Sequence, residues 1–292
     1  MADLNLTPKE AEQLNKIKRL EAHIMKLASD SIVVNMRFLD VAVSALNGEQ
    51  RIGMGGAATD GVKLYYDPVW LLKHYEREPA FAVRMYLHML FHCIFYHSYQ
   101  YGRLDKANWD LAVDLAVENT ILELGIHSAS MKKDDRLLEA VRNLRDYMNG
   151  KGSAEEYARQ VSWNQTGRNE TEKKKRIPFT AEHIYRYLQK NSLRPDERKE
   201  LVSLSHVDEH VTWNVKEEMT IGQEQFQRIS ERVKADLKSF SKNKSKSESL
   251  SANLGEATKE RYDYSHILSR FTQLSEDMSV NDEEFDYIYY TY

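Results

Sequence analysis

The sequence predicts a mainly α-helical fold with a small β element. Five prolines and twelve glycines in 292 residues leave long uninterrupted stretches, and these stretches carry apolar residues at helical spacing. Residues 62–66 (VKLYY) have the β-branched and aromatic content of a short strand. A hydrophobic content of 41% is enough for a sizeable core, so we expect one domain over residues 1–292.

Composition limits the classes of protein to consider. Cys93 is the only cysteine, which excludes an intrachain disulfide and a four-cysteine metal site and favours the cytoplasm. A net charge of -4 provides no overall field for nucleic acid or an anionic membrane. Arg84, His88 and His92 interrupt the most apolar run, residues 81–96, so we expect no membrane span.

The N-terminal part is expected to form a helical hairpin. Thr7, Pro8 and Glu10 match a capping box with proline at the first helical position. The helix that begins there should end near residue 28, and a second helix should cover residues 31–46.

The next segment should contain the strand and the helices that matter most. The glycine-rich residues 52–61 cannot be helical, and the strand at 62–66 follows them. A short helix is expected after Pro68. Longer helices are then predicted at residues 79–98 and 109–124.

The second half of the chain has a weaker pattern. Polar residues 150–177 are expected to be a mobile insertion, and residues 239–258 are expected to be a linker. Helical spacing predicts further helices at residues 134–148, 180–190, 215–240 and 259–274.

Two histidines give the first indication of chemistry. His88 and His92 are four residues apart, so on a helix both imidazoles lie on one face, about one turn apart. This spacing suits two ligands of one metal ion. Histidines that only pack in a core have the same spacing, so the pattern needs support from elsewhere in the chain.

The helix predicted next supplies acidic residues. Asp110, Asp114 and Glu118 follow one another at four-residue spacing, and apolar residues surround them. Asn108 is a predicted N-cap, which would place Asp110 in the first helical turn, where solvent and the helix dipole stabilise its charge. Buried carboxylates repel one another unless a cation or protons compensate, so Asp114 is the predicted third ligand.

Three motifs in order resemble one protein family. Residues 58–68 (ATDGVKLYYDP), 87–97 (LHMLFHCIFYH) and 109–119 (WDLAVDLAVEN) resemble the bacterial metallopeptidase domain that precedes a von Willebrand factor A-like domain. Residues 207–213 (VDEHVTW) and 285–292 (FDYIYYTY) also look like the family's loop and its junction with the A-like domain. The resemblance implies a zincin-like helical domain and a chain that ends where the A-like domain would begin.

The resemblance also implies zinc, or another divalent ion, bound by His88, His92 and Asp114. The family helix usually reads HExxH, but Met89 stands here in place of the glutamate. That glutamate activates the metal-bound water, and general acid–base help of this kind is worth roughly 10²–10⁴ in rate. Glu118 or Asp110 is the candidate replacement base, and Glu118 is equally a candidate fourth ligand or outer partner.

Two functions follow from this departure. The favoured one is a metal-binding, metallopeptidase-like adaptor that couples an AAA+ ATPase of the MoxR type to a client protein or peptide, as the resemblance implies. The alternative is an active metal-dependent peptidase. Nucleic-acid binding is the least favoured, because the basic clusters at residues 173–176 and 242–246 are short and lack interleaved aromatic residues.

Other polar residues have more ordinary interpretations. His97 lies five residues after His92, about 140° around the helix, so it should form a hydrogen bond and not a metal bond. His206, Asp208 and His210 fall in a polar loop where solvent exposure is the usual outcome, and His210 is the best candidate among them to reach the site.

Overall fold

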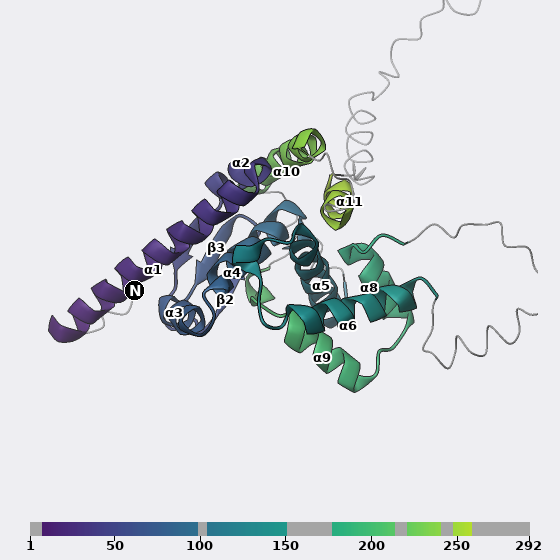
Figure 1. Cartoon of the computed structure of the whole chain (residues 1–292), viewed down its shortest axis with the longest axis horizontal. Coiled ribbons are helices and arrows are strands. Elements are labelled where there is room, and N and C mark those ends of the chain that lie inside the picture. Colours follow the sequence, from purple (N-terminus) through teal and green to yellow (C-terminus); the bar gives the residue numbers. More distant parts are fainter. Residues whose placement is uncertain (1–7, 99–103, 151–176, 214–220, 241–247, 259–292) are drawn as a thin grey trace, which may run out of the picture. The chain divides into compact units, whose positions relative to one another are not determined.

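The computed structural model is mainly helical with one small sheet in its described residues, which confirms the mainly α-helical class with a small β element (Figure 1). The residues that it describes belong to one compact unit, Met1–Thr258. They are residues 8–98, 104–150, 177–213, 221–240 and 248–258. The predicted insertion between residues 150 and 177, the predicted helix at 259–274 and the closing residues lie outside these ranges. Every helix within them is too short or too polar to cross a bilayer.

The N-terminal helix is longer than predicted, and the expected hairpin is wrong. Helix α1 (Pro8–Asn35) continues through the polar residues 29–31, where the sequence predicts a break. These residues are satisfied within the helix, because Ser29 Oγ donates to the carbonyl of Lys26 at 2.8 Å and Lys26 pairs with Asp30 at 3.1 Å. A 3-10 turn, η1 (Arg37–Leu39), and helix α2 (Asp40–Ala45) follow.

Three short strands form the sheet. Strands β1 (Asn47–Gln50), β2 (Ala57–Thr59) and β3 (Lys63–Tyr66) are arranged in the order β1-β3-β2. Strand β1 pairs with β3 in parallel, and β2 pairs with β3 antiparallel. Asp60 closes the turn between β2 and β3, because its carboxylate accepts from the backbone N–H of Val62 and Lys63. The strand predicted at residues 62–66 is confirmed.

Two helices lie at the centre of the fold. After α3 (Pro68–Arg77), helix α4 (Ala80–Ile94) is buried at every position from Phe81 to Ile94. Helix α5 (Lys106–Leu124) has apolar residues in two separate core clusters, one shared with α4 and the sheet and the other shared with later helices. A helix that is buried all round in this way cannot turn its polar side chains toward water.

Later helices cover the two central ones. Helices α6 (Asp134–Met148), α8 (Ala181–Lys190) and α9 (Pro195–Ser205) pack against α5 (Figure 1). Helix α10 (Ile221–Phe240) contacts α4, and α11 (Glu248–Ala257) contacts α5. The linker predicted at residues 239–258 is therefore wrong over α11. This helix is held because Leu250 and Leu254 are buried and Ser249 Oγ donates to Glu123 at 2.7 Å.

The segment after α9 runs along the sheet edge. The backbone N–H of Glu209 donates to the carbonyl of Ala57 at 2.7 Å, and Thr212 Oγ1 donates to the carbonyl of Thr59 at 2.6 Å. Between these contacts lies the short 3-10 turn η4 (His210–Thr212). Strand β2 thus has β3 on one side and residues 206–213 on the other. We name residues 206–213 the edge loop; it brings distant side chains to the central helices.

Candidate metal centre

Two polar stripes, one on each central helix, face each other. Each stripe has a polar residue at every fourth position, so its three side chains share one helix face. The stripe on α4 consists of Arg84, His88 and His92, and the stripe on α5 consists of Asp110, Asp114 and Glu118. Arg84 pairs with Glu118 at 2.9 Å, whereas His92 lies 3.5 Å from Asp114. The pairs run in opposite order, so the two stripes are antiparallel.

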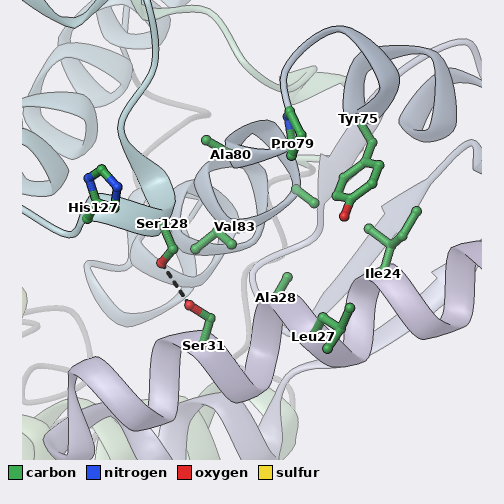
Figure 2. Close-up of a pocket in the computed structure, with 11 residues that line it drawn as sticks. Ile24, Leu27, Ala28, Ser31, Tyr75, Pro79, Ala80, Val83, His127 and Ser128 are labelled. Atoms are coloured by element: carbon green, nitrogen blue, oxygen red, sulfur yellow. Dashed lines mark hydrogen bonds between the residues drawn. The ribbon is translucent and has the colours of Figure 1, made fainter.

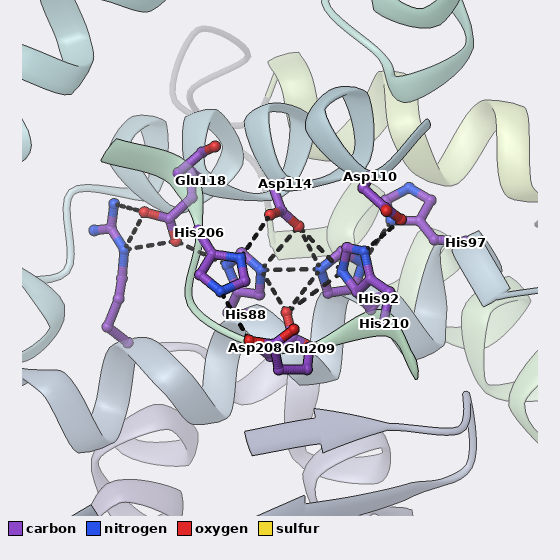
Figure 3. Close-up of polar contacts among 12 residues, drawn as sticks. His88, His92, His97, Asp110, Asp114, Glu118, His206, Asp208, Glu209 and His210 are labelled. Carbon is purple, nitrogen blue, oxygen red and sulfur yellow. Dashed lines mark hydrogen bonds and ion pairs between the residues drawn. The ribbon is translucent and has the colours of Figure 1, made fainter. Parts of the chain in front are cut away.

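Four side chains converge at the middle of these stripes (Figure 3). The Nε2 atoms of His88 and His92 are 2.9 Å apart, and Asp114 Oδ1 lies 3.5 Å from each. Asp208, from the edge loop, places its Oδ1 3.2 Å from His88 Nε2 and 3.7 Å from His92 Nε2. One donor atom from each residue lies within 4.8 Å of the other three, and all four residues are buried.

This geometry fits a divalent cation. Nitrogen and oxygen ligands stand about 2.0–2.2 Å from a tetrahedral zinc ion, so they lie roughly 3.3–3.6 Å from one another. Among the described residues, Asp114 Oδ1 and both carboxylate oxygens of Asp208 are buried without a hydrogen-bond partner. Buried polar atoms are normally satisfied, and oxygens that point into a shared space are best satisfied there by a cation.

Outer contacts hold the two helical imidazoles in this orientation. His88 Nδ1 lies 2.9 Å from Glu118 Oε1, and His92 Nδ1 lies 2.9 Å from His97 Nδ1. Each ring therefore has its Nδ1 occupied while its Nε2 faces the converging donors. Metal-ligating histidines usually have such a partner on the second ring nitrogen. The expected hydrogen-bonding role of His97 is confirmed.

Glu118 is bound on its other side by a buried arginine. Arg84 Nε and Nη2 donate to the two carboxylate oxygens at 2.9–3.2 Å, and both side chains are almost fully buried. Burial by itself raises the pKa of Glu118, but Arg84 and His88 lower it to about 2. The carboxylate is thus held as an anion by fixed partners and faces the outer side of His88. This placement favours the outer-partner role of Glu118 over the role of a base.

Asp110 also has a different environment from the one expected. Helix α5 begins at Lys106 with Asp105 as its N-cap, and Asp105 Oδ1 accepts from the backbone N–H of Asn108 at 3.0 Å. The predicted N-cap role of Asn108 is therefore wrong, and Asp110 lies beyond the first turn. Its Oδ1 is 2.8 Å from His210 Nδ1. Asp110 therefore contacts the edge loop, and it is only partly exposed to solvent.

Opposite charges compensate one another across the site. Burial lowers the pKa of His88 and His210 by itself, but neighbouring carboxylates raise both values well above normal. Burial also tends to raise the pKa of Asp114 and Asp208, but the surrounding histidines lower both. His92 differs, because burial lowers its pKa to about 4. Two imidazolium ions thus balance two carboxylates, and a divalent cation carries the same charge.

Two members of the site were missed from the sequence. Arg84 lies four residues before His88, so the spacing that identified the histidines also identifies it. Asp208 was assigned to a solvent-exposed loop, but it is buried. Of the two neighbours considered with it, His210 is buried and His206 is half-exposed at the rim, with Nδ1 3.9 Å from Asp114 Oδ2. The one signal for Asp208 was its place in the loop motif at residues 207–213.

A separate cavity of about 330 Å³ lies between α1 and the start of α4 (Figure 2). Its lining is mainly apolar and includes Ile24, Leu27, Tyr75 and Val83. No acidic side chain is among the described residues that line it. The clustered polar chemistry described above therefore belongs to the α4–α5 site and not to this cavity.

One comparison with known proteins gives a match. A family model described as a putative metallopeptidase domain matches residues 21–278, which is most of the chain. No curated protein and no solved structure matches the chain.

We predict that Glu118→Gln lowers the free energy of unfolding by about 3 kcal/mol, because it removes the bidentate partner of buried Arg84 and leaves only Asp134, 3.3 Å away, to compensate the charge. Urea denaturation measures this loss. The double variant Glu118→Gln with Arg84→Met should be more stable than the single one. Glu123→Gln is the matched control on the same helix, since its partner Arg145 is 38% exposed. Equal losses at Glu118 and Glu123 would contradict the assigned importance of the buried pair.

Proposed function

Because the chain belongs to the putative metallopeptidase domain family, we propose that it is a metal-binding, metallopeptidase-like protein with little or no peptidase activity. The proposed ion is zinc or a similar divalent metal. The proposed ligands are His88, His92, Asp114 and Asp208. In this proposal the ion stabilises the junction of α4, α5 and the edge loop by compensating two buried carboxylates.

The observation that carries the loss of activity is the residue after the first histidine. Met89 is fully buried in the apolar core, and its thioether cannot take a proton from water. The two candidate replacement bases already have partners. Glu118 is bound by Arg84, and Asp110 contacts His210. The alternative function, an active peptidase with one of these acids as base, therefore gains no support from the geometry.

The arrangement of the helical ligands supports a zincin-like site as part of the proposal. Two histidines one turn apart on a buried helix are the usual ligand pair of such peptidases. In zincins a catalytic zinc ion polarises the substrate carbonyl and activates water. Here the described residues would hold the ion, and neither Glu118 nor Asp110 is left as a free base beside it.

The proposed partner is an AAA+ ATPase of the MoxR type, acting with a client protein or peptide. The support for it is the resemblance of residues 58–68, 87–97 and 109–119 to the bacterial family described above. An A-like domain following this chain stays a prediction. In the adaptor role, the metal centre maintains the fold that the partner recognises.

We predict that the purified chain binds about one zinc ion, and that binding releases about one to two protons near neutral pH. One reason is that His88 has a raised pKa, whereas a ligating imidazole must lose its proton. The other is that a dication beside His210 repels the proton that the carboxylates hold there. Affinity should therefore rise as pH increases through neutrality. Calorimetry in buffers of different ionisation enthalpy measures both quantities.

The control for ion binding is a histidine elsewhere on the surface. His92→Ala should abolish tight binding and the thermal stabilisation by zinc, whereas His23→Ala on the exposed face of α1 should preserve both. An ion at a hundred times its dissociation constant stabilises by about 2.7 kcal/mol, which shifts a melting temperature by several degrees. Melting that zinc and chelator leave unchanged would refute the proposed centre.

We predict that peptide hydrolysis by the zinc-loaded chain is absent or very weak, and that Met89→Glu is the single change most able to raise it. A quenched fluorescent peptide library measures the activity. Met89→Gln is the matched control, since it has similar size without a basic carboxylate. Clear metal-dependent hydrolysis by the natural chain would instead establish the peptidase alternative, whichever residue acts as its base.

We predict that the full chain forms a complex with a purified MoxR-type ATPase, and that the complex weakens when the metal centre is lost. Interferometry with the natural chain, His92→Ala and His23→Ala measures this dependence. Equal binding of the ATPase by all three proteins would contradict this prediction, because the complex would then not depend on the metal centre. No binding by the natural chain, with or without nucleotide, would refute the adaptor role.

A further inference from the structure

We infer that His210 is a fifth metal ligand, so that one ion joins the edge loop to both central helices. The inference rests on the proposed function, because it concerns the same ion. It adds a second imidazole-bearing segment to the site and changes the donor set from two nitrogens and two oxygens to three nitrogens and two oxygens.

The first support is the position of the outer ring nitrogen. His210 Nε2 lies 3.2 Å from Asp114 Oδ1 and 3.5 Å from Asp208 Oδ1. The side chain is 5% exposed, and Nε2 is without a hydrogen-bond partner among the described residues. A buried ring nitrogen that faces two unsatisfied carboxylate oxygens has the environment of a ligand.

The second support is the way the ring is held from behind. Asp110 Oδ1 lies 2.8 Å from His210 Nδ1, just as Glu118 Oε1 lies 2.9 Å from His88 Nδ1. The His210 ring also stacks on Trp213, with centroids 3.7 Å apart and planes 15° apart. A carboxylate on the second nitrogen fixes the tautomer and orientation of a ligating histidine. In this inference Asp110 is a positioning residue for His210.

His210 is not among the four residues whose donor atoms all lie within 4.8 Å of one another. Ligands on opposite sides of an ion stand about twice the bond length apart, roughly 4–4.5 Å. Coordination by His210 therefore requires a small movement of its ring toward the helical donors. Binding of the ion should draw the edge loop slightly inward.

The donor set indicates the class of metal. Three imidazole nitrogens with two carboxylates suit a first-row divalent transition ion, whereas Ca²⁺ and Mg²⁺ prefer oxygen ligands. Five protein donors also leave little room for a reactive water, which agrees with the proposed loss of hydrolysis. The ion then has a mainly structural role, because it joins α4 and α5 to the edge loop.

The test uses Co²⁺ as the probe, because its absorption reports coordination number. The full chain, His210→Ala and Val211→Ala are titrated with Co²⁺, and their affinities and visible spectra are compared. Val211 is the matched control, since it is the next residue of the loop and is 75% exposed. We expect His210→Ala to bind Co²⁺ at least about tenfold more weakly, with stronger visible bands as the site becomes four-coordinate. Val211→Ala should match the natural chain.

A second variant keeps the inference testable if His210→Ala does not fold. Asp110→Asn retains an acceptor for His210 Nδ1 but removes the charge, so it should weaken Co²⁺ binding by roughly tenfold without changing coordination number. If the natural chain binds one Co²⁺ ion and His210→Ala has the same affinity and spectrum, the fifth ligand is refuted while the proposed function stands. If the natural chain binds no Co²⁺ or zinc, both are refuted.

Discussion

The fold depends on the burial of α4 and α5 on all sides. Side chains at residues 81–94 of α4 and 111–121 of α5 cannot reach water, so each charge there must find its partner on the other helix or on a segment that covers them. The stripes on the two helices provide this match, with Arg84 against Glu118 at one end and the histidines against Asp114 in the middle. The carboxylate of Asp208, which comes from the edge loop, adds one more buried negative charge that needs compensation.

The negative charge of Asp114 and Asp208 can be compensated in two ways, by protons on histidines or by a metal ion. Without an ion, His88 and His210 carry protons that compensate Asp114 and Asp208. With an ion, those protons leave and the same four groups become ligands or neighbours of a metal. The fold can therefore form around either kind of charge, and in the proposed function a bound ion would add stability to an arrangement that the helices already define. A site of this kind stabilises the domain even where no reaction is catalysed.

Periodicity predicted the part of the site that lies on helices. Four-residue spacing placed His88 and His92 on one helix face, and Asp114 on one face with Asp110 and Glu118, because a helix repeats every 3.6 residues. The edge loop has no such period. Asp208 reaches the site because its neighbour Glu209 donates its backbone N–H to the carbonyl of Ala57, about 150 positions earlier, and no local pattern reports such a contact. The wrong N-cap of α5 has a local cause. Asp105 and Asn108 both have side chains suited to an N-cap, and the helix begins after Asp105.

The long separation between stripe and loop has a consequence for synthesis. Asp208 follows Glu118 by 90 positions, so at about 5–20 residues per second the edge loop leaves the ribosome roughly 5–20 seconds after α5. During that interval the nascent helix pair presents Asp114 and two histidines without their lid. The donors of α4 and α5 are therefore made before the loop residue that completes the group, and in the finished fold all four residues are buried.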